Sequence, residues 1–121
     1  MIGYSTIGCS DFEKAKTFYD RLLADLGGKR VFGSDRIQFY GGGQGGMLAV
    51  CIPYDKNASA PGNGNMVALS APSREDVDKV YKNALSLGCA DEGAPGERTP
   101  TFYGAYFRDP DGNKLCVFKM G

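Results

Sequence analysis

The feature that most constrains this chain is an internal repeat at an offset of 62 residues. Two stretches carry apolar side chains at the three- and four-residue spacing of an amphipathic helix, one ending at Gly27-Gly28 and one at Gly88. Four apolar positions of the first superpose on four of the second: Ala15 on Val77, Phe18 on Val80, Tyr19 on Tyr81 and Leu23 on Leu85. Such a repeat indicates two similar structural units.

Strand patterns surround the first helix. A strand is predicted over 2–8, and Ser10-Asp11-Phe12-Glu13 has the form of a capping box at the helix start. Three further short strands are predicted over 29–33, 36–40 and 47–52. The glycine-rich stretch 41–46 matches the pattern Gly-x-Gly-x-x-Gly, but a strand follows it. Because a dinucleotide site needs a helix there, we interpret it as a turn.

The second copy starts with a strand over 65–71 and a helix beginning at Ser73, and it ends in a hairpin over 102–119. Within the hairpin, Asp109-Pro110-Asp111-Gly112-Asn113 supplies turn chemistry. A calcium loop is the alternative. It fails because the sixth position is not glycine and Met120 occupies the place of the bidentate Glu.

One copy, with one helix and an open sheet, is too small to bury a core alone. We therefore expect an α+β fold in which two βαβββ modules form a mixed eight-stranded, cup-shaped sheet. A single domain over 1–121 would comprise module one over 1–56, a linker over 53–63 and module two over 64–121. The alternative is a single α+β sheet with chance similarity between its halves.

Composition limits the function. The formal net charge is zero and the pI is about 6.2, which gives no electrostatic footprint for nucleic acid or an anionic membrane. No apolar run approaches transmembrane length and no leader pattern is present, so we expect a cytoplasmic protein. The cysteines are far apart, and we expect them to be reduced and buried: Cys9, Cys51, Cys89 and Cys116. The absence of histidine removes the commonest metal ligand and general base.

Several stretches together resemble one known family. These are Tyr4-Ser5-Thr6-Ile7-Gly8 with Ser10-Asp11, Phe18-Tyr19, Gly62-Asn63-Gly64, and the run from Tyr106 to Leu115. They look like the glyoxalase / bleomycin-resistance / extradiol-dioxygenase superfamily, the vicinal oxygen chelate fold. The resemblance implies paired βαβββ modules that form a cup, often in homodimers. It also implies a divalent metal ion held in the cup by His, Gln or Glu in the enzymes of the family.

The implied metal ligands are missing from this chain. The resemblance places Tyr4 and Met66 at the two His positions, Cys116 at the Glu position, and Leu48 or Ala49 at a fourth position. A phenol, a thioether and a thiol do not suit Mg²⁺, Mn²⁺ or Fe²⁺. Soft Cu(I) tolerates Met and Cys, but sulfur side chains on packed strands are more often core. We expect no metal and no cofactor.

The candidate ligand-binding residues are Tyr4, Thr6, Met66, Tyr106 and Cys116. Strand alternation and the family's implied ligand positions select Tyr4, Met66 and Cys116. The resemblance to fosfomycin-resistance members adds Tyr106 and Thr6. A pocket with these side chains is apolar and aromatic with a few hydroxyl groups, which suits a small organic molecule.

Each candidate also has a structural interpretation: the tyrosines fill the cup and the cysteine is core. A nucleophilic Cys116 would depend on Lys114 or an arginine. Arg98 and Arg108 either pair with a ligand carboxylate or are solvated. Carboxylates that could act as a general base are Asp91, Glu92 and Glu97.

The sequence therefore predicts a metal-free protein that binds a small organic ligand, as a homodimer and without nucleic acid or membrane partners. One alternative is a lyase, isomerase or dioxygenase-type enzyme of the same superfamily that acts without metal or with an atypical site. Another is a filled cup with a structural or dimerising role.

Overall fold

A computed structural model describes residues 1–42 and 45–121, which form two βαβββ units. The first unit consists of β1 (Tyr4–Gly8), α1 (Phe12–Ala24), β2 (Lys29–Gly33), β3 (Ile37–Gly41) and β4 (Met47–Cys51). The second consists of β5 (Val67–Ser70), α2 (Arg74–Ser86), β6 (Ala90–Thr99), β7 (Phe102–Arg108) and β8 (Lys114–Met120). The predicted repeat is confirmed. Two positions of the predicted glycine-rich turn, 43 and 44, lie outside the described residues.

Each unit builds its own four-stranded mixed sheet. The strand orders are β1-β4-β3-β2 and β5-β8-β7-β6, so the two sheets share one topology. In each sheet the first strand pairs in parallel with the last, and the remaining pairs are antiparallel. The predicted fold class is confirmed, with the eight strands divided equally between two sheets rather than joined in one hydrogen-bonded sheet.

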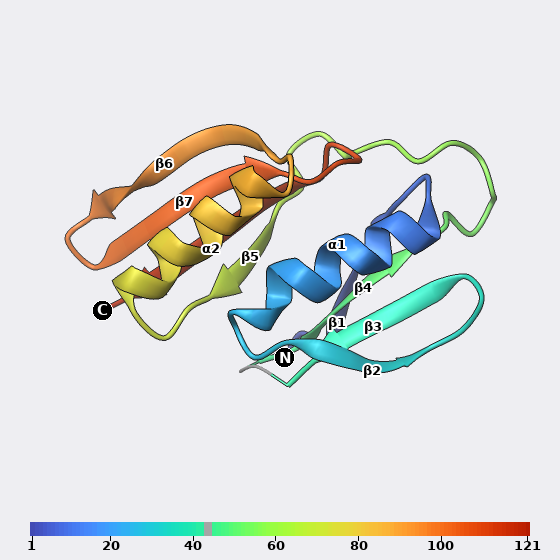
Figure 1. Ribbon diagram of the computed structural model, residues 1–121, viewed down its shortest axis with the longest axis horizontal. Coiled ribbons are helices and arrows are strands. Elements are labelled where there is room, and N and C mark those ends of the chain that lie inside the picture. Colours follow the sequence, from blue (N-terminus) through green and yellow to red (C-terminus); the bar gives the residue numbers. More distant parts are fainter. Residues whose placement is uncertain (43–44) are drawn as a thin grey trace.

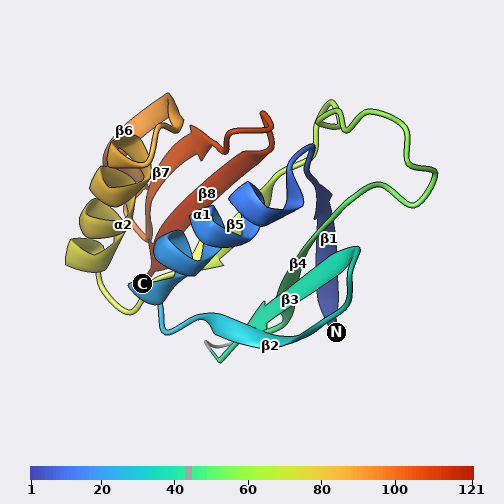
Figure 2. The same cartoon turned by 45° about the vertical axis from the view of Figure 1, so that its right-hand side comes forward.

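Both helices cover the same side of the sheets (Figure 1). The core lies between the helix layer and the sheet layer and draws buried side chains from both units. Residues 53–63 belong to the loop between β4 and β5, which extends away from both sheets in Figure 2. Among the described residues, no helix covers the opposite side of either sheet. We call it the helix-free face, and it consists of the strand side chains that alternate with those of the core.

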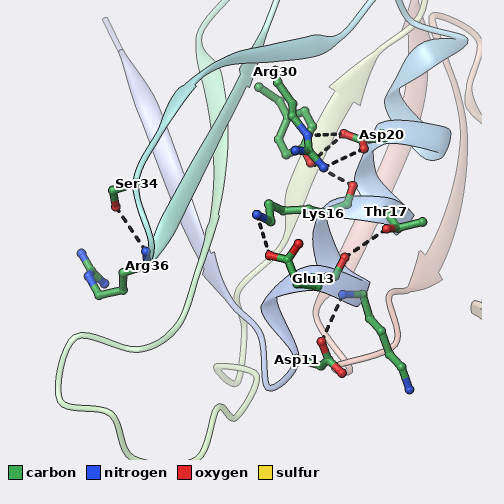
Figure 3. Close-up of polar contacts among 10 residues, drawn as sticks. Asp11, Glu13, Lys16, Thr17, Asp20, Arg30, Ser34 and Arg36 are labelled. Carbon is green, nitrogen blue, oxygen red and sulfur yellow. Dashed lines mark hydrogen bonds and ion pairs between the residues drawn. The ribbon is translucent and has the colours of Figure 1, made fainter.

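The start of α1 differs from the predicted capping box. Asp11 is the N-cap residue, and its side chain accepts a hydrogen bond from the Lys14 backbone N–H at 3.1 Å, as Figure 3 shows. Ser10 instead donates to Asp111, with its backbone N–H at 2.9 Å and its hydroxyl at 2.8 Å. The Ser10 hydroxyl, which was predicted to cap the helix, therefore donates instead to Asp111, which is distant in the sequence. The predicted start of α2 is confirmed, with Ser73 as its N-cap.

The first helix is fixed to its own sheet by polar contacts at the edge of the core. Arg30 of β2 makes a bidentate pair with Asp20 of α1, with both N–O distances at 2.9 Å (Figure 3). The Tyr40 hydroxyl of β3 donates to the same carboxylate at 3.0 Å. These contacts fix the direction of α1 over β2 and β3.

The two units are joined by a buried carboxylate in the turn between β7 and β8. Asp109 is 5% exposed and accepts hydrogen bonds from the Tyr19 hydroxyl of α1 and from the backbone N–H groups of Asp111 and Asn113. The Asn113 amide also donates to Asp109, and it donates to the Gly8 carbonyl oxygen at 2.8 Å. The predicted Asp-Pro-Asp-Gly-Asn turn thus holds the first unit against the second.

The four cysteines are buried and free, as predicted. No helix among residues 1–42 and 45–121 is long and apolar enough to cross a membrane.

Candidate functional site: the helix-free face

All five predicted ligand-binding residues belong to the helix-free face. Their strand neighbours point the other way: Ile7, Val67, Leu69, Ala105, Phe107, Leu115 and Val117 pack in or against the core. Alternation therefore turns Tyr4 and Thr6 of β1, Tyr106 of β7 and Cys116 of β8 away from the helices. Met66 directly precedes β5, and alternation continued from that strand places it on the helix-free side. The face combines residues from both sheets.

The first sheet presents aromatic rings on this face. Tyr4 is 55% exposed, and its ring meets that of Phe39 edge to face with centroids 5.0 Å apart. Phe32 stacks on Phe39 at 4.3 Å and is also exposed. Thr6 is exposed two residues after Tyr4. This half of the face offers flat apolar surface with a phenol and a hydroxyl at its edge.

The second sheet presents two cations around one tyrosine. Tyr106 pairs in register with Cys116 across β7 and β8. The Arg98 guanidinium lies 5.3 Å from the centre of the Tyr106 ring, and the Lys114 Nζ lies 5.6 Å from it. Arg98 also donates to two carbonyl oxygens of its own strand, those of Gly96 and Ala94. A cation near an aromatic face is attracted by the ring quadrupole, which holds both charges on this side of the sheet.

Burial keeps the reactive groups of this cluster protonated. Burial raises the pKa of the Cys116 thiol, and Tyr106, Arg98 and Lys114 oppose that rise without cancelling it. Burial and the neighbouring Cys116 raise the pKa of the Tyr106 phenol. At neutral pH the pair is a thiol and a phenol. Neither group is a ready nucleophile, because nucleophilic attack requires the thiolate or the phenolate.

Two cavities lie between the free edges of β1 and β5. One of about 410 Å³ is lined by residues that include Ile2, Met47 and Met66, and the other of about 430 Å³ by residues that include Thr6, Met66 and Lys114. Met66 is 46% exposed and lines both. The predicted set is therefore divided. Thr6 and Met66 share a cavity, Tyr106 and Cys116 are neighbours on the second sheet, and Tyr4 packs on Phe39.

The site residues do not fit the divalent metal ion implied by the family resemblance. Tyr4 offers an exposed phenol, Met66 a thioether, and Cys116 a fully buried, protonated thiol. Divalent ions of the catalytic type need about three oxygen or nitrogen donors that converge, or thiolates. Within residues 1–42 and 45–121, no group of three or more His, Cys, Asp or Glu side chains is placed to hold a metal ion.

The carboxylates considered as general bases are engaged elsewhere. Glu97 pairs with Arg74 at 2.8 Å, and Glu92 pairs with Arg108 at 2.7 Å. Asp91 accepts a hydrogen bond from the Gly93 backbone N–H at 2.9 Å. Each is satisfied by a local partner, which is the usual state of a carboxylate with a structural role.

Three residues of the face were not among the predicted ligand-binding set. Phe32 and Phe39 stack beside Tyr4, and Lys114 lies beside Tyr106 while lining a cavity. Phe39 lies on the opposite side of β3 from Tyr40, which belongs to the core cluster, and it is buried beneath Tyr4 and Phe32. No local signal existed for Phe32, since the register between β2 and β3 shifts after Arg30.

Comparisons with known proteins agree on one family. A family model described as the Glyoxalase/Bleomycin resistance protein/Dioxygenase superfamily matches residues 1–117. A glyoxalase/bleomycin resistance protein from Albidiferax ferrireducens T118 is 31% identical, with a TM-score of 0.88 over 97% of both chains. A glyoxalase/bleomycin resistance protein/dioxygenase family enzyme from Burkholderia phytofirmans PsJN is 16% identical, with a TM-score of 0.78 over 98% of both chains. A lactoylglutathione lyase from Agrobacterium tumefaciens is 20% identical, with a TM-score of 0.71 over 98% of this chain and 92% of the other. No curated protein matches this chain.

Proposed function

Because the chain belongs to the Glyoxalase/Bleomycin resistance protein/Dioxygenase superfamily, we propose that it binds a small organic molecule on its helix-free face without a metal ion. The observation that carries the proposal is the chemistry of three positions. Tyr4, Met66 and Cys116 supply a phenol, a thioether and a protonated thiol, a set that favours apolar contact over coordination of a divalent ion.

The surroundings of these residues support an organic ligand. The exposed rings of Tyr4 and Phe32, which pack on the buried Phe39, provide apolar contact area, and Thr6 and Tyr106 provide hydroxyl groups. Small-molecule sites commonly combine a mostly apolar lining with a few polar groups that orient the ligand. The proposed ligand-binding set is Tyr4, Thr6, Met66, Tyr106 and Cys116.

We further propose that the protein acts in the cytoplasm as a homodimer, with a small organic ligand as its partner. The rings of Tyr4 and Phe32 are each 55% exposed, and both pack against Phe39 on the first sheet. Clustered exposed apolar residues mark interaction surfaces more often than free surface. The measurement that tests the dimer is the molar mass from light scattering, and a monomer across the micromolar range would contradict it.

The enzymatic alternative, a lyase or isomerase that acts without metal, would depend on Tyr106 and Cys116. With both pKa values raised, these groups are proton donors at neutral pH rather than bases. Under this alternative, turnover would be constant at neutral pH and fall only above pH 9, where the ordinary thiol begins to ionise. A fall in turnover between pH 6 and pH 8 would contradict it.

The test of binding is a thermal-shift screen of small organic compounds in the presence of EDTA. A compound that binds only the folded state raises its melting temperature by mass action. Ala68 lies opposite Cys116 across β5 and β8 and is exposed, so Ala68→Trp adds bulk to the face without entering the core. Lys82→Trp adds the same bulk to the exposed surface of α2 and serves as the control.

We expect hits that survive EDTA, vanish in Ala68→Trp and persist in Lys82→Trp. Hits that require a divalent ion, or that bind both variants equally, would overturn the proposal.

A further inference from the structure

The free edges of β1 and β5 border a seam between the two sheets. In the part of the chain that the structure describes, each strand pairs on one side only, β1 with β4 and β5 with β8. The two cavities of about 410 and 430 Å³ lie along this seam and share Ser5, Met66 and Val67 in their walls. Since they share these residues, one ligand can extend from one cavity into the other.

The two cavities differ in chemistry. The first is lined largely by apolar side chains, including Ile2, Leu26, Met47 and Leu48. The second is lined by polar side chains at Thr6, Asn65, Asn113 and Lys114, together with a glycine-rich stretch of the linker. Among the described residues that line either cavity, none is acidic. The seam therefore has an apolar end and a polar end that carries a positive charge.

The charge of Lys114 is not neutralised by a protein carboxylate. Among residues 1–42 and 45–121, the ion pairs within 4.0 Å involve Lys16, Arg30, Arg74, Lys79 and Arg108, and neither Lys114 nor Arg98. Both of these cations lie within 5.6 Å of the Tyr106 ring centre. Two neighbouring cations without a counter-charge create a local positive potential that attracts anions.

We propose that the ligand is a small organic anion with an apolar body, such as a carboxylate, phosphate or sulfonate on an aromatic or aliphatic frame. Its anionic group pairs with the Lys114 ammonium and the Thr6 hydroxyl in the polar cavity, and its body lies past Met66 in the apolar cavity. Arg98 adds positive potential from the far side of the cluster. This assignment rests on the proposed function, since it specifies the ligand class of the site that contains Thr6 and Met66. The apolar cavity extends from these residues past the edge of the helix-free face to Leu23 of α1.

The test uses two probes that share one ring system. Anilinonaphthalene sulfonate is anionic, and phenylnaphthylamine is its uncharged counterpart. Both fluoresce when they enter an apolar site, so their dissociation constants can be measured by titration. The variants are Lys114→Gln, Arg98→Lys, Ala68→Trp and, as the matched charge control on the exposed surface of α2, Lys82→Gln. Equal melting temperatures for Lys114→Gln and the parent protein confirm that the variant is folded.

We expect Lys114→Gln to weaken the sulfonate about tenfold, the usual worth of one charge-assisted contact, and to leave the neutral probe unchanged. Arg98→Lys retains the charge and changes neither constant by more than about twofold. Lys82→Gln changes neither, and Ala68→Trp weakens both probes. Raising the salt concentration weakens only the sulfonate.

Two contrary results separate the two proposals. If Ala68→Trp blocks both probes but Lys114→Gln leaves the sulfonate unchanged, the face binds organic molecules and the anionic assignment is wrong. If Ala68→Trp leaves both probes bound as tightly as before, the proposed binding site itself is wrong, and the assignment falls with it.

Discussion

The two halves of the molecule share a topology but differ in how they use it. Both have a thirteen-residue helix over a mixed four-stranded sheet with the same strand order. The tyrosine that repeats at an offset of 62 residues has opposite surroundings in the two halves. Tyr19 is 1% exposed, and its hydroxyl donates to Asp109 of the other half. Tyr81 is only partly buried, and its pKa is raised first by burial and then by Asp91 of its own half.

This difference shows where the symmetry of the repeat ends. The turn after β7 has buried acceptors that bind α1, and the corresponding stretch after β3 is rich in glycine. The polar contacts around Asp109 therefore favour one arrangement of the two halves. The helix-free faces differ as well, with stacked rings on the first sheet and two cations on the second. The repeat determines the fold, and the differences between its copies determine docking and ligand chemistry.

The largest expected effect comes from the buried carboxylate. Asp109→Ala removes the acceptor of Tyr19, Asn113 and two backbone N–H groups, and it leaves buried donors unsatisfied. We expect a loss of about 3 kcal/mol or more in the free energy of unfolding, measured with urea. The control is Asp91→Ala, an exposed carboxylate of the same half, for which we expect about 1 kcal/mol or less. Equal losses would show that the buried contacts of Asp109 add nothing to the joining of the two halves.

A smaller effect is expected from the repeated tyrosine itself. Tyr19→Phe removes one hydrogen bond to a buried carboxylate, so we expect a loss of about 1.5 kcal/mol in the free energy of unfolding. Tyr81→Phe removes the hydroxyl of a residue that is only partly buried and should cost less than about 0.5 kcal/mol. Urea denaturation of the two variants measures this difference between the halves directly. A larger loss for Tyr81→Phe than for Tyr19→Phe would contradict our account.

The buried thiols should make both halves sensitive to alkali. Burial raises the pKa of Cys9 to about 11 and that of Cys89 to about 12, above the ordinary value of 9.0. The folded protein keeps both protons while the unfolded chain loses them, so stability is complete below pH 9 and falls from pH 9 towards pH 11 and 12. At pH 9 the expected loss is about 0.4 kcal/mol for each thiol, because the unfolded thiol is then half ionised.

Urea denaturation at pH 7, 9 and 10 measures this loss, and Cys9→Ala and Cys89→Ala should each flatten the profile. An unchanged slope in both variants would assign the alkaline loss to other groups.

The smallest effects are expected from surface ion pairs, one in each half. Arg30→Gln breaks a bidentate pair with Asp20 and should cost about 0.5 kcal/mol. Arg74→Gln breaks a single contact with Glu97 and should cost less. The two variants are compared by urea denaturation at low and high salt, where both losses should shrink as salt rises. A loss above about 2 kcal/mol for either would mean that its pair has a larger structural role.

Much of the fold could be predicted because its signals are local. The apolar spacing from Ala15 to Leu23 and its repetition after Ser73 identified both helices and the duplication. The turn from Asp109 to Asn113 was predicted from residue chemistry alone. The Ser10 capping box was wrong because Asp111, 101 residues away, takes its hydroxyl, and spacing within one helix carries no information about such a partner.

The helix-free face was predicted only in part, because some of its features depend on contacts between distant parts of the chain. The family resemblance placed Tyr106 and Cys116 on the cup side of their strands, and the register of β7 and β8 makes them neighbours. The seam between β1 and β5 could not be predicted from single strands. Its width depends on how the helix layer packs, which involves contacts such as that of Tyr19 with Asp109. The role of Lys114 in the cavity wall follows from the seam and so was not foreseen.

The central claim is that this superfamily member binds an organic ligand without a metal ion. Native mass spectrometry of the protein purified without chelators tests it most directly. The account predicts a dimer mass with no bound divalent ion, either without excess or with the added mass of an organic molecule that Ala68→Trp fails to retain. One divalent ion on each chain, lost when Cys116 or Tyr4 is replaced by Ala, would contradict the claim.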